Sequence, residues 1–149
     1  MPHLTEQHLN ALAESHVTAW VTGGTPAGAP IPAGLRFEES GSLFRSDVRR
    51  FLDFLRGVAD DAAYRFHWAV SRCRHRSVHV RVYLSPVAAG GLSKGATLRL
   101  RLHIGEDDSL SALTVIYRPA KLIACLSPNR RTALARRILY TLGLYRIRP

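Results

Sequence analysis

The sequence lacks any run of about 18 apolar residues, the length that a membrane-spanning helix requires. It has only two cysteines, Cys73 and Cys125, and neither has the spacing of a metal site. Its first twenty residues mix acidic and amide side chains with apolar ones, which is not the layout of a signal peptide. We therefore expect a cytoplasmic protein with no membrane partner and no bound metal, whose thiols are packing residues.

Lysine is almost absent, because Lys94 and Lys121 are the only two among 21 lysines and arginines. With 11 acidic residues, the formal net charge is +10. Such a charge favours an anionic partner: a nucleic acid, a phosphorylated ligand or an acidic carrier protein. A second explanation is compositional, since arginine replaces lysine in the proteins of G+C-rich genomes. The basic residues are spread along the chain rather than clustered, so a nucleic-acid partner is the less favoured of these.

The spacing of apolar residues predicts helices and strands that are segregated along the chain. Helices are expected over 5–21, 46–59 and 128–142, and strands over 35–39, 64–72, 76–85, 96–104 and 111–119. The last helix, part of a C-terminal helix and tail over 128–149, has an apolar stripe of Leu134, Ile138 and Leu142 that we expect to be dry. Residues 22–34 form a Gly/Pro loop that we expect to act as a lid. The order favours a single α+β domain over 1–149 with a mainly antiparallel sheet.

The four successive strands alternate between apolar and polar residues, which predicts one dry and one wet face. The apolar face includes Phe66, Trp68, Val80, Val82, Leu100 and Leu102, and the basic face includes Arg65, His67, His79, Arg81, Arg99 and Arg101. Burying the six apolar side chains against the helices contributes on the order of 10 kcal/mol gross, so we expect that face inside. The basic face repels itself and needs water, Glu38, a partner's acids or phosphate to offset it. The reverse orientation, with the basic groups enclosed as catalytic equipment, stays open as the alternative.

Four successive segments of the chain carry a resemblance to a known superfamily. A long first helix is followed by a strand like GLRFEESG, a helix like SDVRRFLDFLRGV and a meander ending in DDSLSALTVIYRPAKLI. Over residues 5–125 this resembles the nuclear-transport-factor-2-like superfamily, also described as SnoaL-like or ketosteroid-isomerase-like. The resemblance implies a cone: a strongly curved sheet wrapped around helices with an internal pocket, here with an extra C-terminal helix. It also implies a homodimer. Superfamily enzymes include polyketide cyclases, ketosteroid isomerases, dehydratases and limonene-type epoxide hydrolases, whereas other members only bind.

The sequence departs from the superfamily pattern in two places. The Gly/Pro loop stands where a second short helix is usual. The four predicted strands from 64 to 119 contain no Asp or Glu, although superfamily enzymes generally use carboxylates there. Neither a ketosteroid-isomerase-type Asp base nor the Asp–Arg–Asp relay of limonene-type epoxide hydrolases is therefore visible.

Three residues are candidates for acid–base chemistry. His16 lies on the apolar stripe of the first helix, one turn before Trp20, and a buried neutral imidazole transfers protons near neutral pH. Tyr64 and Tyr117 are candidate donors to a developing oxyanion. The expected pocket for an apolar substrate is lined by Trp20, Phe66, Trp68, Val80 and Leu100. The alternatives are a core histidine bonded to a carbonyl and tyrosines that only form a wall. His67 and His79 have no third ligand at metal spacing.

Two main functions compete. The first is a small cofactor-independent biosynthetic enzyme that performs acid–base cyclisation, isomerisation or dehydration on an apolar polyketide-like or aromatic intermediate. The second is a non-catalytic binding module whose basic face holds an acidic protein or nucleic acid. A third is a member without activity that helps other enzymes assemble. The apolar interior favours the enzyme, and the missing strand carboxylates favour the binding module.

Overall fold

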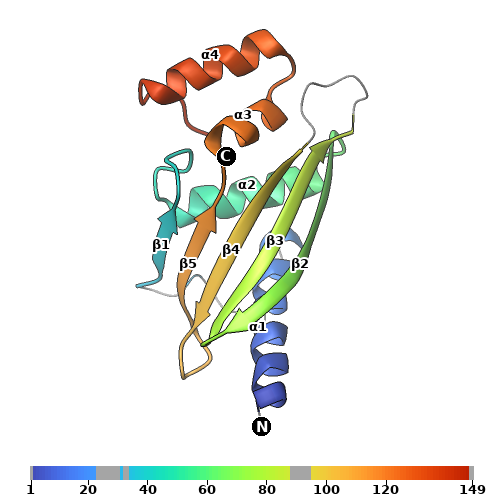
Figure 1. The fold of residues 1–149 in the computed structure, drawn as a ribbon, viewed down its shortest axis with the longest axis vertical. Coiled ribbons are helices and arrows are strands. Elements are labelled where there is room, and N and C mark those ends of the chain that lie inside the picture. Colours follow the sequence, from blue (N-terminus) through green and yellow to red (C-terminus); the bar gives the residue numbers. More distant parts are fainter. Residues whose placement is uncertain (1, 23–30, 32–33, 88–94, 148–149) are drawn as a thin grey trace.

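The fold consists of one sheet with helices on one face and at one end (Figure 1). The computed structural model describes residues 2–22, 31, 34–87 and 95–147. Its elements are α1 (Pro2–Thr22), β1 (Arg36–Glu39), α2 (Val48–Asp60), β2 (Tyr64–Arg74), β3 (Ser77–Pro86), β4 (Ala96–Ile104), β5 (Leu110–Ile116), α3 (Pro119–Leu126) and α4 (Arg130–Thr141). Most of the predicted lid over 22–34 falls at 23–30 and 32–33, outside the described residues. Among the described helices, none combines the length and apolarity that a bilayer span needs.

The five strands form an open, mixed sheet in the order β1-β5-β4-β3-β2. β1 runs parallel to β5, and the other neighbours are antiparallel. The pairing register shifts between Val70 and Arg72 and between His103 and Ile104, and such irregularities bend a sheet and increase its twist. The predicted α+β class with a mainly antiparallel sheet and a C-terminal helix is confirmed.

The core lies between the sheet and the helices α1 and α2. Along β4, Leu98, Leu100, Leu102 and Ile104 are buried while the residues between them are exposed. Leu9, Ala13 and Val17 of α1 and Phe51 and Leu55 of α2 pack into the same cluster. No charged or amide side chain belongs to the buried class among the described residues. The apolar face is therefore inside, as predicted, and the reverse orientation is wrong.

A tight turn between β1 and α2 is held by the carboxylate of Glu39. Glu39 accepts hydrogen bonds from the backbone N–H groups of Phe44 (3.2 Å) and Ser46 (2.8 Å) and from the hydroxyl of Tyr117 (2.5 Å). The Tyr117 hydroxyl in turn accepts from the Leu43 N–H at 3.0 Å. One β1 carboxylate and one tyrosine thus satisfy backbone donors that the turn leaves without strand partners.

The C-terminal region differs from its prediction. Two helices stand where a strand end and one helix over 128–142 were expected: Pro119 starts α3 directly after β5, and Asn129 caps α4 by accepting from the Thr132 N–H. The predicted dry stripe of the last helix is wrong. Leu134, Ile138 and Leu142 are 58%, 53% and 65% exposed, because α4 packs on α3 beyond the end of the sheet, with a different side turned inward.

Candidate functional site

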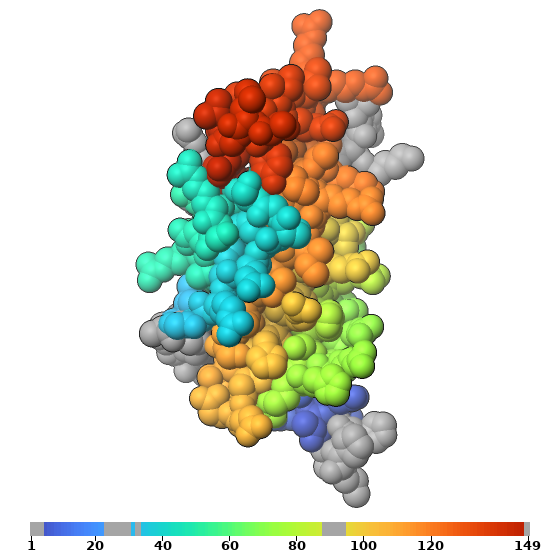
Figure 2. Space-filling view, turned by 60° about the vertical axis from the view of Figure 1, so that its left-hand side comes forward, coloured from blue at the N-terminus to red at the C-terminus, as the bar shows by residue number. Residues whose placement is uncertain are grey.

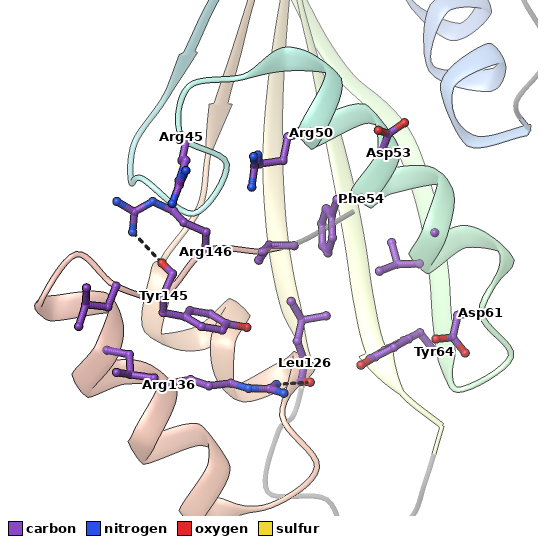
Figure 3. Close-up of a pocket in the computed structure, with 15 residues that line it drawn as sticks. Arg45, Arg50, Asp53, Phe54, Asp61, Tyr64, Leu126, Arg136, Tyr145 and Arg146 are labelled. Atoms are coloured by element: carbon purple, nitrogen blue, oxygen red, sulfur yellow. Dashed lines mark hydrogen bonds between the residues drawn. The ribbon is translucent and has the colours of Figure 1, made fainter.

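A cavity of about 1150 Å³ lies where α2 and the start of β2 meet the C-terminal region, and we call it the C-terminal cavity. Figure 3 shows side chains that enter it from α2, from α4 and from the segment after α4. Its apolar walls are Phe54, Val58, Leu126, Leu139, Leu144 and Ile147. Its polar lining consists of Arg45, Arg50, Asp53, Asp61, Tyr64, Arg136, Tyr145 and Arg146. The cavity therefore combines an apolar surface with cationic, acidic and phenolic groups.

The wall contributed by the C-terminal segment is fixed by contacts with the β1–α2 turn, against which Figure 2 shows the C-terminal region packed. The Ile147 N–H donates to the Leu43 carbonyl at 3.0 Å. The Tyr140 hydroxyl accepts from the Ser42 N–H at 3.1 Å. Gly41 makes this approach feasible, because a Cβ there would lie 2.9 Å from the Tyr140 hydroxyl oxygen. These hydrogen bonds thus fix the segment after α4 in place as one wall of the cavity.

Two arginines add positive charge to the cavity lining, Arg50 from α2 and Arg146 from the segment after α4. Their Nε atoms are buried away from the cavity and have no hydrogen-bond partner among the described residues. The Arg146 guanidinium also donates through Nη1 to the Tyr145 carbonyl at 2.8 Å. The two cationic side chains favour a ligand that brings an oxygen or a negative charge.

The guanidinium of Arg136, unlike the Nε atoms of Arg50 and Arg146, has hydrogen-bond partners in the protein. Its Nη1 donates to the Leu126 carbonyl at 3.0 Å and to the Ser127 hydroxyl at 3.3 Å. Its guanidinium carbon also lies 5.8 Å from the centre of the Tyr145 ring. These contacts tie α4 to the end of α3 and orient the Tyr145 ring at the cavity wall (Figure 3).

Tyr64 and Asp61 both line the cavity where α2 meets β2. Asp61 ends α2, and its carboxylate accepts from the Ala63 N–H at 2.9 Å. Burial raises the pKa of Tyr64 above its ordinary value, and Cys125 and Asp61 raise it further, whereas Arg136 opposes them. The Tyr64 phenol therefore keeps its proton at neutral pH and is suited to donate a hydrogen bond to a developing oxyanion.

The other predicted catalytic residues lie elsewhere. His16 is half-buried on α1, its ring centre 5.9 Å from that of Trp20, and burial lowers its pKa. Tyr117 is 5% exposed, and its hydroxyl is bonded within the β1–α2 turn. Burial, followed by the hydrogen bond to Glu39, raises the pKa of Tyr117. Of the three predicted catalytic residues, only Tyr64 lines the C-terminal cavity.

The predicted substrate-binding residues belong to the core or its border. Val80 and Leu100 are 1% and 0% exposed, so they present no surface to a ligand in this structure. Trp20, Phe66 and Trp68 are half-buried and pack against the core cluster. The structure brings His16 and Trp20 together as expected but joins neither to Tyr64 in the lining of the C-terminal cavity.

The predicted basic face exists on the outside of the sheet. Arg65, His67, Arg81, Arg99 and Arg101 are exposed, and His79 is half-buried. Desolvation lowers the pKa of His79, and the neighbouring arginines lower it further. Among the described residues, no group of three or more His, Cys, Asp or Glu side chains is placed to hold a metal ion.

Sequence reasoning missed most of the polar lining of the C-terminal cavity, including Arg50, Asp53, Asp61, Tyr145 and Arg146. A signal was present in the tail. Gly143 directly follows α4 with φ of +76°, and apolar and aromatic residues resume after it. A glycine that ends a helix followed by Leu144 and Tyr145 indicates a chain that folds back onto the protein.

Comparisons with known proteins support the fold. No protein-family model and no curated protein sequence matches the chain. Among solved structures, an M. tuberculosis LEH-like epoxide hydrolase has a TM-score of 0.52 at 11% identity, over 93% of this chain and 98% of its own. An NTF2-like protein of unknown function from Cytophaga hutchinsonii has a TM-score of 0.50 at 14% identity, over 76% of this chain and 93% of its own. A de novo designed NTF2-fold protein has a TM-score of 0.50 at 14% identity, covering 91% and 95% of the two chains.

Proposed function

We propose a function from the site as well as the fold, because the nuclear-transport-factor-2-like fold, expected from the resemblance and confirmed by these structural likenesses, does not by itself assign a reaction. Its site leads us to propose that the protein is a small enzyme that catalyses proton transfer on an apolar substrate in the C-terminal cavity. The reaction class is cyclisation, isomerisation or dehydration of a polyketide-like or aromatic intermediate, without a cofactor. The observation that carries this proposal is one cavity whose lining joins apolar walls to the cationic side chains of Arg50 and Arg146 and the carboxylate of Asp61.

The lining residues divide the proposed chemistry between them. The Asp61 carboxylate accepts a proton from carbon and returns it to the intermediate, and the Tyr64 phenol donates a hydrogen bond to the oxygen on which charge develops. Arg50 and Arg146 stabilise the negative charge that develops on the substrate oxygen. Asp53 and Asp61 thus place carboxylates on α2 and at its end, whereas the sheet has none facing the core.

The proposal explains why the cavity needs the C-terminal segment. Leu139, Leu144 and Ile147 complete an apolar wall opposite Phe54 and Val58. This wall gives an apolar substrate a surface to pack against. A homodimer, an acidic carrier protein that delivers the substrate and a single domain over 1–149 stay predictions.

The test uses 5-nitrobenzisoxazole, an apolar aromatic probe. A base removes its carbon-bound proton, the N–O bond breaks and a coloured phenolate is released, so turnover reports base and oxyanion stabilisation together. We expect Asp61→Asn to lower kcat/KM about a hundredfold and Arg50→Gln to lower it by a similar factor.

The matched control is Asp60→Asn, since Asp60 precedes Asp61, is exposed and does not line the cavity. This variant should keep the wild-type rate. Equal losses in Asp60→Asn and Asp61→Asn, or a wild-type rate no higher than that of free acetate at equal concentration, would contradict the proposal.

A further inference from the structure

A second hollow of about 560 Å³ lies on the outer face of the sheet, and we call it the sheet groove. It forms where β3, β4 and the end of β5 meet the start of α3. Four cationic side chains line it, and its lining contains no carboxylate: Arg81, Arg99, Arg118 and Lys121. α1 and α2 cover the opposite face of the sheet, so the sheet groove is separate from the C-terminal cavity (Figure 1).

Strand register forces two of these cations together. Arg81 of β3 pairs directly with Arg99 of β4, and Arg99 pairs on its other side with Ile116 of β5. Neighbouring strands lie about 4.8 Å apart, and like charges directly opposite destabilise a sheet. Arg118, which precedes α3, and Lys121 in its first turn add two more positive charges at the same end.

None of the four cations is neutralised within the described chain. All four are exposed. The ion pairs among the described residues join Asp108 to His8 and to Arg76, far from the sheet groove in the sheet register. The arrangement therefore retains a local repulsion that a multiply charged anion would relieve.

We propose that the sheet groove binds an organic anion that carries a diphosphate. Guanidinium groups match phosphate oxygens in bidentate geometry, and four cations suit a group with two to four negative charges. Ile116, which is 43% exposed in the groove lining, offers an apolar surface to the organic part of the ligand.

The neighbouring surface favours a compact anion over a long one. The next hollow along the same face, of about 350 Å³, contains Arg36 and Arg101 but also the carboxylate of Glu38. A nucleic-acid strand that followed the face would therefore meet a negative charge one step beyond the groove.

The probe for this site is inorganic pyrophosphate, measured by isothermal titration at constant ionic strength. Arg99→Gln and Arg118→Gln should each raise Kd about tenfold or more, because each removes a charge-assisted contact. The matched control is Arg49→Gln, which removes the same charge from an exposed position on α2 and should change Kd less than twofold. Absence of pyrophosphate binding to the wild type, or an equal loss in Arg49→Gln, would overturn the proposal.

A second arm separates a diphosphate site from a nucleic-acid surface. A single-stranded oligonucleotide is titrated against the wild type and against Arg36→Gln, whose residue lies in the neighbouring hollow. The proposal predicts that Arg36→Gln leaves pyrophosphate binding unchanged and that pyrophosphate displaces any bound oligonucleotide. Tighter oligonucleotide binding that depends on Arg36 as strongly as on Arg99 would replace the diphosphate site with a nucleic-acid surface.

Discussion

The core beneath the sheet and the C-terminal cavity follow different physical rules. In the core, alternate residues of β3 and β4 are apolar and fully enclosed, and the helices bring only apolar side chains to meet them. In the C-terminal cavity, arginines, aspartates and two tyrosines share the lining with apolar walls, and the Nε atoms of two of these arginines are buried without a partner among the described residues. The core is built for stability, whereas the cavity keeps polar groups available at the expense of local stability.

The two regions also differ in how far apart their residues are in the sequence. The core repeats one local pattern along β3 and β4, and hairpin pairing brings these neighbours together. The cavity joins α2 to a tail that begins more than eighty residues later, at Gly143. A local pattern predicts the first arrangement, but only tertiary packing creates the second.

The largest expected effect breaks the core. Leu100→Ala removes a side chain that is 0% exposed at the centre of β4, and we expect a loss of about 3 kcal/mol in the free energy of unfolding. Urea denaturation followed by circular dichroism measures it. The control Arg99→Ala changes the next residue on the outer face and should cost less than about 0.5 kcal/mol. Similar losses in both variants would mean that the two faces are not distinct.

The next effect breaks the cavity without touching the core. Tyr64→Phe removes the phenolic hydrogen-bond donor, and we expect kcat for the 5-nitrobenzisoxazole reaction to fall about tenfold with little change in the unfolding midpoint. His16→Phe is the comparison, because His16 does not line the cavity, and it should leave kcat unchanged. If His16→Phe instead abolished turnover, the active site would lie at the α1 stripe that the sequence pattern suggested.

The sequence predicts the core well because its signal is periodic and local. Leu98, Leu100 and Leu102 face inward with the period of two that a half-buried strand imposes, and the structure buries all three. The outward placement of Arg81 and Arg99 follows from the same period. The alternation in the sequence therefore predicts which residues lie on each face of the sheet.

The C-terminal region was less predictable because the spacing of its apolar residues predicts a helix but does not show where that helix packs. Leu134 and Ile138 have helical spacing, which predicts burial, yet both are exposed because α4 lies beyond the sheet. The sequence predicts a solvated charge at Arg136, but its guanidinium donates a hydrogen bond to the Leu126 carbonyl at the end of α3. Tyr64 was found by its residue type alone, and its partners at the cavity depend on a tail whose position no local pattern specifies.

A smaller effect distinguishes a structural tyrosine from a catalytic one. Tyr117→Phe leaves the Leu43 N–H and the Glu39 carboxylate without their shared partner, and we expect a loss of about 2 kcal/mol in unfolding free energy. Turnover of the folded variant should be unchanged. The control Tyr140→Phe loses only one exposed bond, to the Ser42 N–H, and should cost about 0.5 kcal/mol. A Tyr117→Phe protein of normal stability but no activity would restore its predicted catalytic role.

The smallest effect concerns the pH dependence of stability at the border of the core. Burial lowers the pKa of His16 below its unfolded value of 6.5, so the unfolded chain binds a proton more readily than the folded protein does. Stability from this group is complete above pH 6.5 and declines as the pH falls toward the lowered pKa. His16→Phe, which cannot protonate, should therefore lose less stability than the wild type between pH 7 and pH 5, as measured by urea midpoints. His79→Phe is the comparison on the outer face, where desolvation and then the neighbouring arginines lower the histidine pKa, so the difference between its profile and that of the wild type should be largest at low salt and shrink as salt is added. A His16→Phe profile parallel to that of the wild type would mean that the α1 stripe is open to water, which would remove the contrast between a dry core and a wet cavity.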